Sequence, residues 1–216
     1  MSVPLNTLRQ LREQFPGSSW ALWSEEYPDE GCIEERPDQL VEFIESNRSQ
    51  LNPEVVFVSL NPSSDLPTDY ANFHSPSWKH YDERIKEFVQ ENELENLMGG
   101  YMTDIVPDVA DPNSANVTPD GADLDRFYTQ LSILDKPEYH VICFTGKTFE
   151  ALKSHFGAEV QQYQHNIESF TASLEEKTLH VYRVWFYGLY GVHQQKVAEL
   201  EKQLTFLNDE VVELAE

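Results

Sequence analysis

The sequence predicts an α/β fold, a three-layer α/β/α sandwich with a central, mostly parallel four-stranded sheet. Three segments, 55–60, 140–144 and 179–186, are almost continuously apolar, as strands buried on both faces of a parallel sheet usually are. A weaker fourth segment, 101–106, ends at Pro107. Segments with helical spacing of apolar residues lie between these strands, and strands that alternate with helices favour βαβ crossovers and a parallel sheet.

The helical segments are predicted from apolar residues that recur every three or four positions. Between and after the strands, these segments cover residues 81–97, 122–134, 146–156 and 192–207. Ahead of the first strand, residues 7–15 and 37–51 are predicted as two additional helices. Residues 108–120 are rich in Asp, Asn and Pro, which predicts a long surface loop.

The chain length of 216 residues predicts a single domain, residues 1–216, with residues 1–51 as a helical N-terminal extension packed on it. No segment approaches the roughly eighteen consecutive apolar residues that a membrane-spanning helix needs. Residues 1–16 lack the basic and then apolar pattern of a secretory signal. We therefore expect a cytoplasmic protein that does not engage a membrane.

The charge of the chain argues against an ordinary nucleic-acid binder. Thirty-eight acidic and fifteen basic residues give a net charge of -23, whereas phosphate neutralisation by basic residues supplies most non-specific affinity for DNA. A local basic exception consists of His74, Lys79, His80, Arg84 and Lys86. The charge has three alternative explanations: a solvated acidic surface, a surface that repels wrong ligands, or an acidic patch that faces a partner.

The sequence predicts neither a metal site nor a cofactor. Cys143 lies in the apolar run 141–144, so we expect a buried thiol rather than half of a disulfide with Cys32. Two cysteines cannot build a cysteine metal site. No histidine pair has helical ligand spacing with an acidic partner, so we expect polar surface or loop positions for His74, His80 and His193.

The loops that follow the predicted strands are the places to look for function, because ligands bind beyond the carboxyl ends of parallel strands. The segment Thr145-Gly146-Lys147-Thr148 is not a phosphate loop, since the Walker pattern requires glycine at position 141. The loop Ser59-Leu60-Asn61-Pro62-Ser63 leaves a buried strand directly into an Asn-Pro turn, which stiffens the backbone and fixes the direction of the Asn61 carboxamide. Phe73 follows twelve residues later.

These motifs resemble the uracil-DNA glycosylase superfamily, most closely the mismatch-specific uracil/thymine-DNA glycosylases. In that family a strand ends in Gly-hydrophobic-Asn-Pro-Gly, and the following loop has Phe three residues before Pro. The residues that match in type and spacing are Asn61, Pro62, Phe73 and Pro76. The resemblance continues in order through residues 99–107, 136–137 and 141–147, and it covers about residues 55–204. The chain looks like a divergent member.

The resemblance implies hydrolysis of the N-glycosidic bond of uracil, or of a related damaged base, in DNA. Asn61 would be the catalytic residue and would position the attacking water through its carbonyl oxygen. Phe73 would stack on the flipped base, and the backbone amides around residues 60–63 would donate to the carbonyl oxygens of the base. The substrate-binding residues implied are Leu60, Pro62, Ser63, Phe73, Tyr187, Gly188 and Leu189. A plain turn at Asn61 and core packing of Phe73 are the structural alternatives.

The chain departs from the family pattern in two places. Ser59 and Ser63 replace two glycines that let the backbone approach the base. In the fourth-strand motif Gly188 and Leu189 match, but Asn-Pro-Ser is replaced by Trp185, Phe186 and Tyr187. Two alternatives therefore stay open beside a glycosylase acting on single-stranded or damaged DNA. One is a catalytically degenerate module that binds a nucleobase, a nucleotide or a protein, and the other is an enzyme acting on a free nucleoside.

Overall fold

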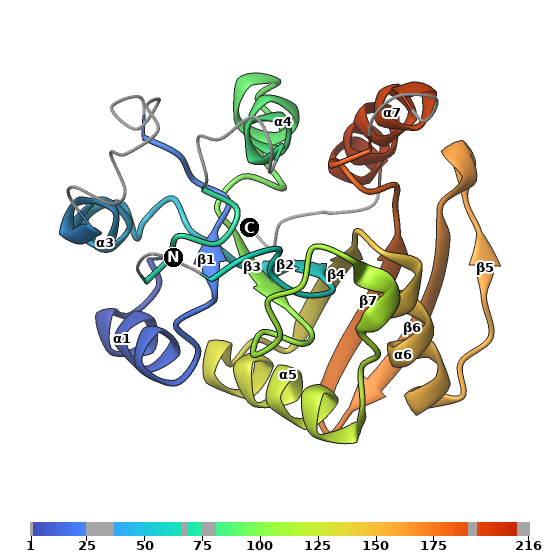
Figure 1. The fold of residues 1–216 in the computed structure, drawn as a ribbon, viewed down its shortest axis with the longest axis horizontal. Helices are drawn as coiled ribbons and strands as arrows, with labels where there is room; N and C mark the ends of the chain where they lie inside the picture. The colour runs from blue at the N-terminus through green and yellow to red at the C-terminus, as the bar shows by residue number, and fades with distance from the viewer. Residues whose placement is uncertain (1, 25–36, 66–68, 75–80, 190–193, 211–216) are drawn as a thin grey trace.

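The computed structural model describes residues 2–24, 37–65, 69–74, 81–189 and 194–210 (Figure 1). Predictions made for Cys32, Pro76, Lys79, His80 and His193 lie outside these residues. No helix within these ranges is long and apolar enough to cross a membrane.

The four predicted strands form the parallel centre of the sheet, which confirms the α/β class. They are β2 (Asn52–Ser59), β3 (Gly100–Asp104), β4 (Glu138–Cys143) and β7 (Lys177–Arg183). Their spatial order is β3-β2-β4-β7, with every neighbouring pair parallel. Strands β2 and β4 are largely apolar because both of their faces are buried, as in other parallel sheets, whereas β7 also has polar residues at partly exposed positions.

The predicted sheet of four strands is wrong, because the described residues form a mixed sheet of seven strands in the order β1-β3-β2-β4-β7-β6-β5. The additional strands are β1 (Ser19–Trp20), β5 (Gln161–Gln162) and β6 (Glu168–Leu174), and each pairs in antiparallel fashion. Two of them have only two residues, too few to show a period. The third, β6, is partly exposed and carries polar residues, so it lacks an apolar run. The N-terminal segment, predicted as helices alone, therefore also supplies an edge strand.

Helices α5 (Gly121–Leu134) and α6 (Gly146–Phe156) match their predicted extents because both begin at strong caps. The Asp120 carboxylate accepts from the backbone of Ala122 and Asp123, and the Thr145 hydroxyl accepts from the backbone of Thr148. The other α-helices of the described residues are α1 (Leu5–Gln14), α3 (Pro37–Ser46), α4 (Asp82–Lys86) and α7 (Gln194–Glu210).

Two predicted helices are shorter than expected. The helix expected over residues 37–51 ends at Ser46. The helix expected over residues 81–97 consists of α4 and a π-helical turn, η1 (Glu87–Glu91), after which Glu93 takes a left-handed backbone angle of φ 55°. A left-handed residue cannot continue a right-handed helix, so the chain turns there towards β3.

Helices pack on both faces of the sheet (Figure 1), and the buried side chains form one apolar core on each face. One core joins the sheet to α1, α3, α5 and α6, and the other joins it to α4, η1 and α7. Cys143 lies in the first core as a buried free thiol, as predicted. Because the helices cover the faces, the carboxyl edge of the parallel strands is left for a ligand site.

Candidate functional site

A cavity of about 690 Å³ lies at the carboxyl edge of the parallel strands. Its wall is formed by the loops that follow β2, β3, β4 and β7, together with residues 71–73 and the first residues of α4. The structure brings all the predicted site residues to this wall: Leu60, Asn61, Pro62, Ser63, Phe73, Tyr187, Gly188 and Leu189. Residues more than a hundred positions apart thus share one cavity, as expected for loops that follow neighbouring parallel strands.

The Asn61 carboxamide is fixed by three backbone carbonyls. Its Nδ2 donates to the oxygens of Pro62 at 2.8 Å, Val109 at 3.0 Å and Asp111 at 2.8 Å. Three backbone carbonyls on one side identify that side as the nitrogen, because the amide oxygen is an acceptor and cannot donate to any of them. Asn61 therefore fastens the loop 108–120 to the end of β2, a structural function that the sequence did not predict, and Oδ1 lies on the opposite side.

Phe73 forms part of the cavity wall and is held in a strained backbone conformation. Its φ of 64° is left-handed, which is uncommon for a bulky residue and clusters at binding sites when it occurs. The indole nitrogen of Trp23 donates to the Phe73 carbonyl at 3.0 Å and stabilises this backbone. The ring also packs in the core next to α4, 6.4 Å from the ring of Tyr187. Phe73 therefore lines the cavity and also packs in the apolar core, so both positions predicted for this side chain are found.

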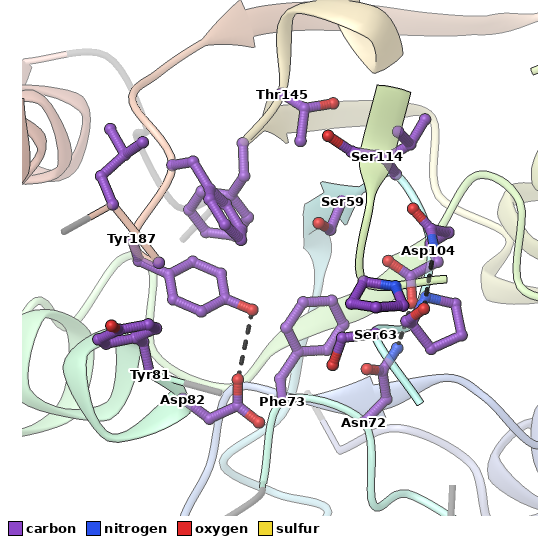
Figure 2. A pocket seen from close by; sticks show the side chains of 18 of the residues that line it. Ser59, Ser63, Asn72, Phe73, Tyr81, Asp82, Asp104, Ser114, Thr145 and Tyr187 are labelled. Atoms are coloured by element: carbon purple, nitrogen blue, oxygen red, sulfur yellow. Dashed lines mark hydrogen bonds between the residues drawn. The ribbon is translucent and has the colours of Figure 1, made fainter. Parts of the chain in front are cut away.

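The aromatic loop after β7 is fixed from two sides. Tyr187 packs edge-on against Phe144 at 5.2 Å, and its hydroxyl donates to Asp82 Oδ1 at 3.4 Å (Figure 2). Burial, with the nearby charges of Asp82 and Asp104, raises the pKa of Tyr187 well above its ordinary value. Arg84 donates to the carbonyl oxygens of Tyr187 at 3.0 Å and Leu189 at 2.6 Å. Tyr187 therefore belongs to the wall, and the cavity remains open beside it.

Asp104 is a site residue that sequence reasoning did not select. It is the last residue of β3, only 2% exposed, and it lines the cavity. Asn72 Nδ2 donates to Asp104 Oδ2 at 2.7 Å, whereas Oδ1 has no hydrogen-bond partner among the described residues. Burial raises the pKa of this carboxyl to about 7. A carboxylate at the end of a buried parallel strand was the available sequence signal.

The charged groups that the described residues place on the wall are mainly acidic. Among these residues the carboxyl groups are those of Asp65, Asp82, Asp104 and Asp111, and the basic groups are those of Arg183 and Lys196. Both basic side chains have partners, since Arg183 pairs with Glu168 and the Lys196 ammonium lies 4.2 Å from the centre of the Trp185 ring. The wall therefore provides weak electrostatic support for a phosphate backbone.

Lys147, from the segment excluded as a phosphate loop, and His74, predicted at the surface or in a loop, both lie near the cavity. The Lys147 ammonium donates to the carbonyl oxygens of Ser114 at 2.6 Å, Ala115 at 3.1 Å and Val117 at 2.7 Å, so it anchors the same loop as Asn61. His74 lies in a loop, as predicted, but it is buried against the Trp20 carbonyl instead of being at the surface, because the loop folds over β1. No cluster of three or more potential metal-ligating side chains occurs in the described parts of the chain.

The fold and the cavity define an α/β protein with a preformed pocket at the carboxyl edge of its parallel strands. No protein-family model and no curated protein matches the chain. The proposal for its function therefore depends on the chemistry of the cavity wall.

Proposed function

We propose that this protein hydrolyses the N-glycosidic bond of uracil, or of a related damaged base, in DNA, as a divergent protein of the uracil-DNA glycosylase type. The observation that carries the proposal is the convergence of Asn61, Phe73 and the 187–189 loop on one cavity. The sequence motifs alone indicate these residues. A cavity of about 690 Å³ has room for a nucleobase and its sugar.

The geometry of Asn61 supports the assignment of a water-positioning role. The two N–H groups of its Nδ2 are shared among three carbonyls, so the side chain cannot rotate without breaking these hydrogen bonds. A fixed amide oxygen can hold a water molecule in one orientation at no reorganisation cost during the reaction. Phe73, kept in place by its strained backbone and the Trp23 hydrogen bond, would offer its ring to the base.

The arrangement of the helices supports the same proposal. With helices on both faces of the sheet, we interpret the fold as the three-layer α/β/α sandwich of this superfamily, extended by the edge strands β1, β6 and β5.

A second candidate function is hydrolysis of a free nucleoside. The acidic wall and the net charge of -23 favour it, because a neutral nucleoside does not have to overcome repulsion between carboxylates and phosphates. Binding of a nucleobase without catalysis is the outcome expected if the aromatic replacement of the fourth-strand motif has abolished catalysis.

The two candidates differ in substrate and can be separated in one assay. Purified protein is incubated at low salt with uracil-containing single- and double-stranded oligonucleotides and, separately, with a panel of nucleosides, and released base is quantified by chromatography. Abasic-site formation supports the DNA glycosylase, and base release from nucleosides alone supports the second candidate. No release above an Asn61→Ala variant with any substrate would overturn the enzymatic proposal.

Lys147→Ala is the matched control, because Asn61→Ala also frees the loop 108–120. Lys147 anchors that loop through three carbonyls without lining the cavity. If Asn61 acts on the reaction, Asn61→Ala lowers the rate much more than Lys147→Ala does. Equal losses would mean that Asn61 contributes only by anchoring the loop.

A further inference from the structure

The carboxyl group of Asp104 lines the cavity but is only partly hydrogen-bonded. Figure 2 shows Asp104 and Asn72 on one side of Phe73, with Tyr187 and Asp82 on the other side. Asn72 Nδ2 donates to Asp104 Oδ2 at 2.7 Å and also to the Gly17 carbonyl at 2.9 Å, so the carboxyl is held in one orientation. Oδ1, on the side not bound by Asn72, is buried and has no partner among the described residues.

A buried oxygen without a partner is costly, and a ligand that reaches it can supply the missing hydrogen bond. If the carboxyl is ionised, Oδ1 can only accept a hydrogen bond, and if it is protonated it can donate one. Burial raises the pKa of Asp104 to about 7, so the protonated form is present at neutral pH and dominates below it. The group can therefore give a proton to a ligand atom that lies against Oδ1.

The acidic side chains among the described residues of the cavity wall favour a departing base that is neutral. A base that leaves as an anion would lie in a cavity whose wall carries the carboxyl groups of Asp65, Asp82 and Asp111. Arg183, paired with Glu168, and Lys196, lying over Trp185, compensate weakly. Like charges in a partly enclosed cavity repel one another strongly, so a neutral leaving group is favoured over an anionic one.

We propose that Asp104 is the general acid that protonates the departing base, an inference that depends on the proposed glycosidic-bond hydrolysis. In this step the electron pair of the C1′–N bond moves onto the base, and the proton on Asp104 Oδ1 is transferred to the base. The oxygen of the water held by Asn61 bonds to C1′, and the proton that this water loses restores Asp104 through solvent. The products are the free base and the sugar hydroxyl, so atoms and charge balance without any further reactant.

Several other titratable groups line the cavity or lie near Asp104, and their titration has to be distinguished from that of Asp104. Tyr187 and Asp82 lie across the cavity, and the pKa of Tyr187 is raised far above the range tested. His74, next to the Asn72 loop, has its pKa lowered to about 4 by burial and stays neutral at higher pH. The other titratable residues on the wall are Asp65, Tyr81, Asp111, Arg183 and Lys196.

The test is the pH dependence of single-turnover base release between pH 5 and 9 on the substrate that wild-type protein cleaves. Wild type is expected to slow about tenfold per pH unit above about pH 7, as the acid form disappears. Asp104→Asn keeps the hydrogen bond with Asn72 but cannot transfer a proton, so it is expected to be about 100-fold slower at pH 6 or below, with no alkaline decline. Asp82→Asn, a matched buried carboxyl in the same cavity, is expected to keep the alkaline decline.

A second measurement needs only wild-type protein. A 4-nitrophenyl deoxyriboside carries a leaving group that departs as a stable anion, so its hydrolysis is expected to show no decline through pH 7. The same decline with this substrate, or the same pH profile in wild type and Asp104→Asn, would overturn the general-acid assignment alone. Absence of base release by wild type from every substrate would overturn the proposed function and this assignment together.

Discussion

Replacing Asp104 by Asn is expected to change how the stability of the protein depends on pH. The pKa of this carboxyl is raised from its ordinary value of 3.8 to about 7 in the folded protein, because burial disfavours the charged form. A raised carboxyl pKa means that the unfolded chain releases the proton first as pH rises. Stability associated with Asp104 is therefore complete below pH 4, is lost between about pH 4 and pH 7, and stays lost above that range.

The size of the effect follows from the shift. About three pKa units at roughly 1.4 kcal/mol per unit correspond to about 4 kcal/mol of unfolding free energy. Asparagine has nearly the same shape and can keep the hydrogen bond with Asn72, so the two proteins are expected to differ little at pH 4. At pH 8 the Asn variant is expected to be more stable than wild type by about 4 kcal/mol.

Urea denaturation of both proteins at several pH values between 4 and 8 measures this difference. His74 and His140, whose pKa values burial lowers to about 4, have the opposite sign and destabilise the fold as pH falls below 6.5. Both proteins contain them, so their contribution cancels in the difference. Parallel stability curves for the two proteins would refute the conclusion that Asp104 is a buried carboxyl with a raised pKa.

Three further substitutions test other parts of the structure. Lys147→Ala is expected to lower the free energy of unfolding by about 1–2 kcal/mol and to speed proteolysis within residues 108–120, because three carbonyls lose a charged donor; an unchanged cleavage rate would contradict this anchor. Arg84→Met keeps an apolar stem but removes two hydrogen bonds to the 187–189 loop, so faster amide hydrogen exchange is expected there, and wild-type protection would argue against the clamp. Gly99→Ala is expected to cost about 2–5 kcal/mol in thermal or urea unfolding, because its φ is 73° and a Cβ would lie 2.0 Å from the Gln50 carbonyl oxygen. Gly157→Ala is the matched control, left-handed at φ 59° but with open space around the Cβ position, and a cost equal to that of Gly99→Ala would refute the clash.

The sequence by itself determined the centre of the fold. The parallel strands could be predicted because burial on both faces requires continuous apolar runs, a signal that depends only on neighbouring residues. The starts of α5 and α6 could be predicted because the apolar spacing begins next to the caps Asp120 and Thr145. Loops that follow parallel strands lie at the carboxyl edge of the sheet. The sequence therefore also identified the edge where the cavity lies, with Asn61, Phe73 and residues 187–189 along it.

Only the tertiary structure decided what those residues contact. Asn61 reaches carbonyls 48 and 50 positions away, and Tyr187 reaches a carboxylate 105 positions away, and no local pattern encodes such pairs. The two-residue edge strands exist because β3 and β6 have free edges to pair with, not because of their own sequence. The raised pKa of Asp104 likewise comes from burial by several distant segments. Local apolar patterns therefore determined the scaffold, whereas the packing of distant loops decided how the predicted site is held and where its buried carboxyl lies.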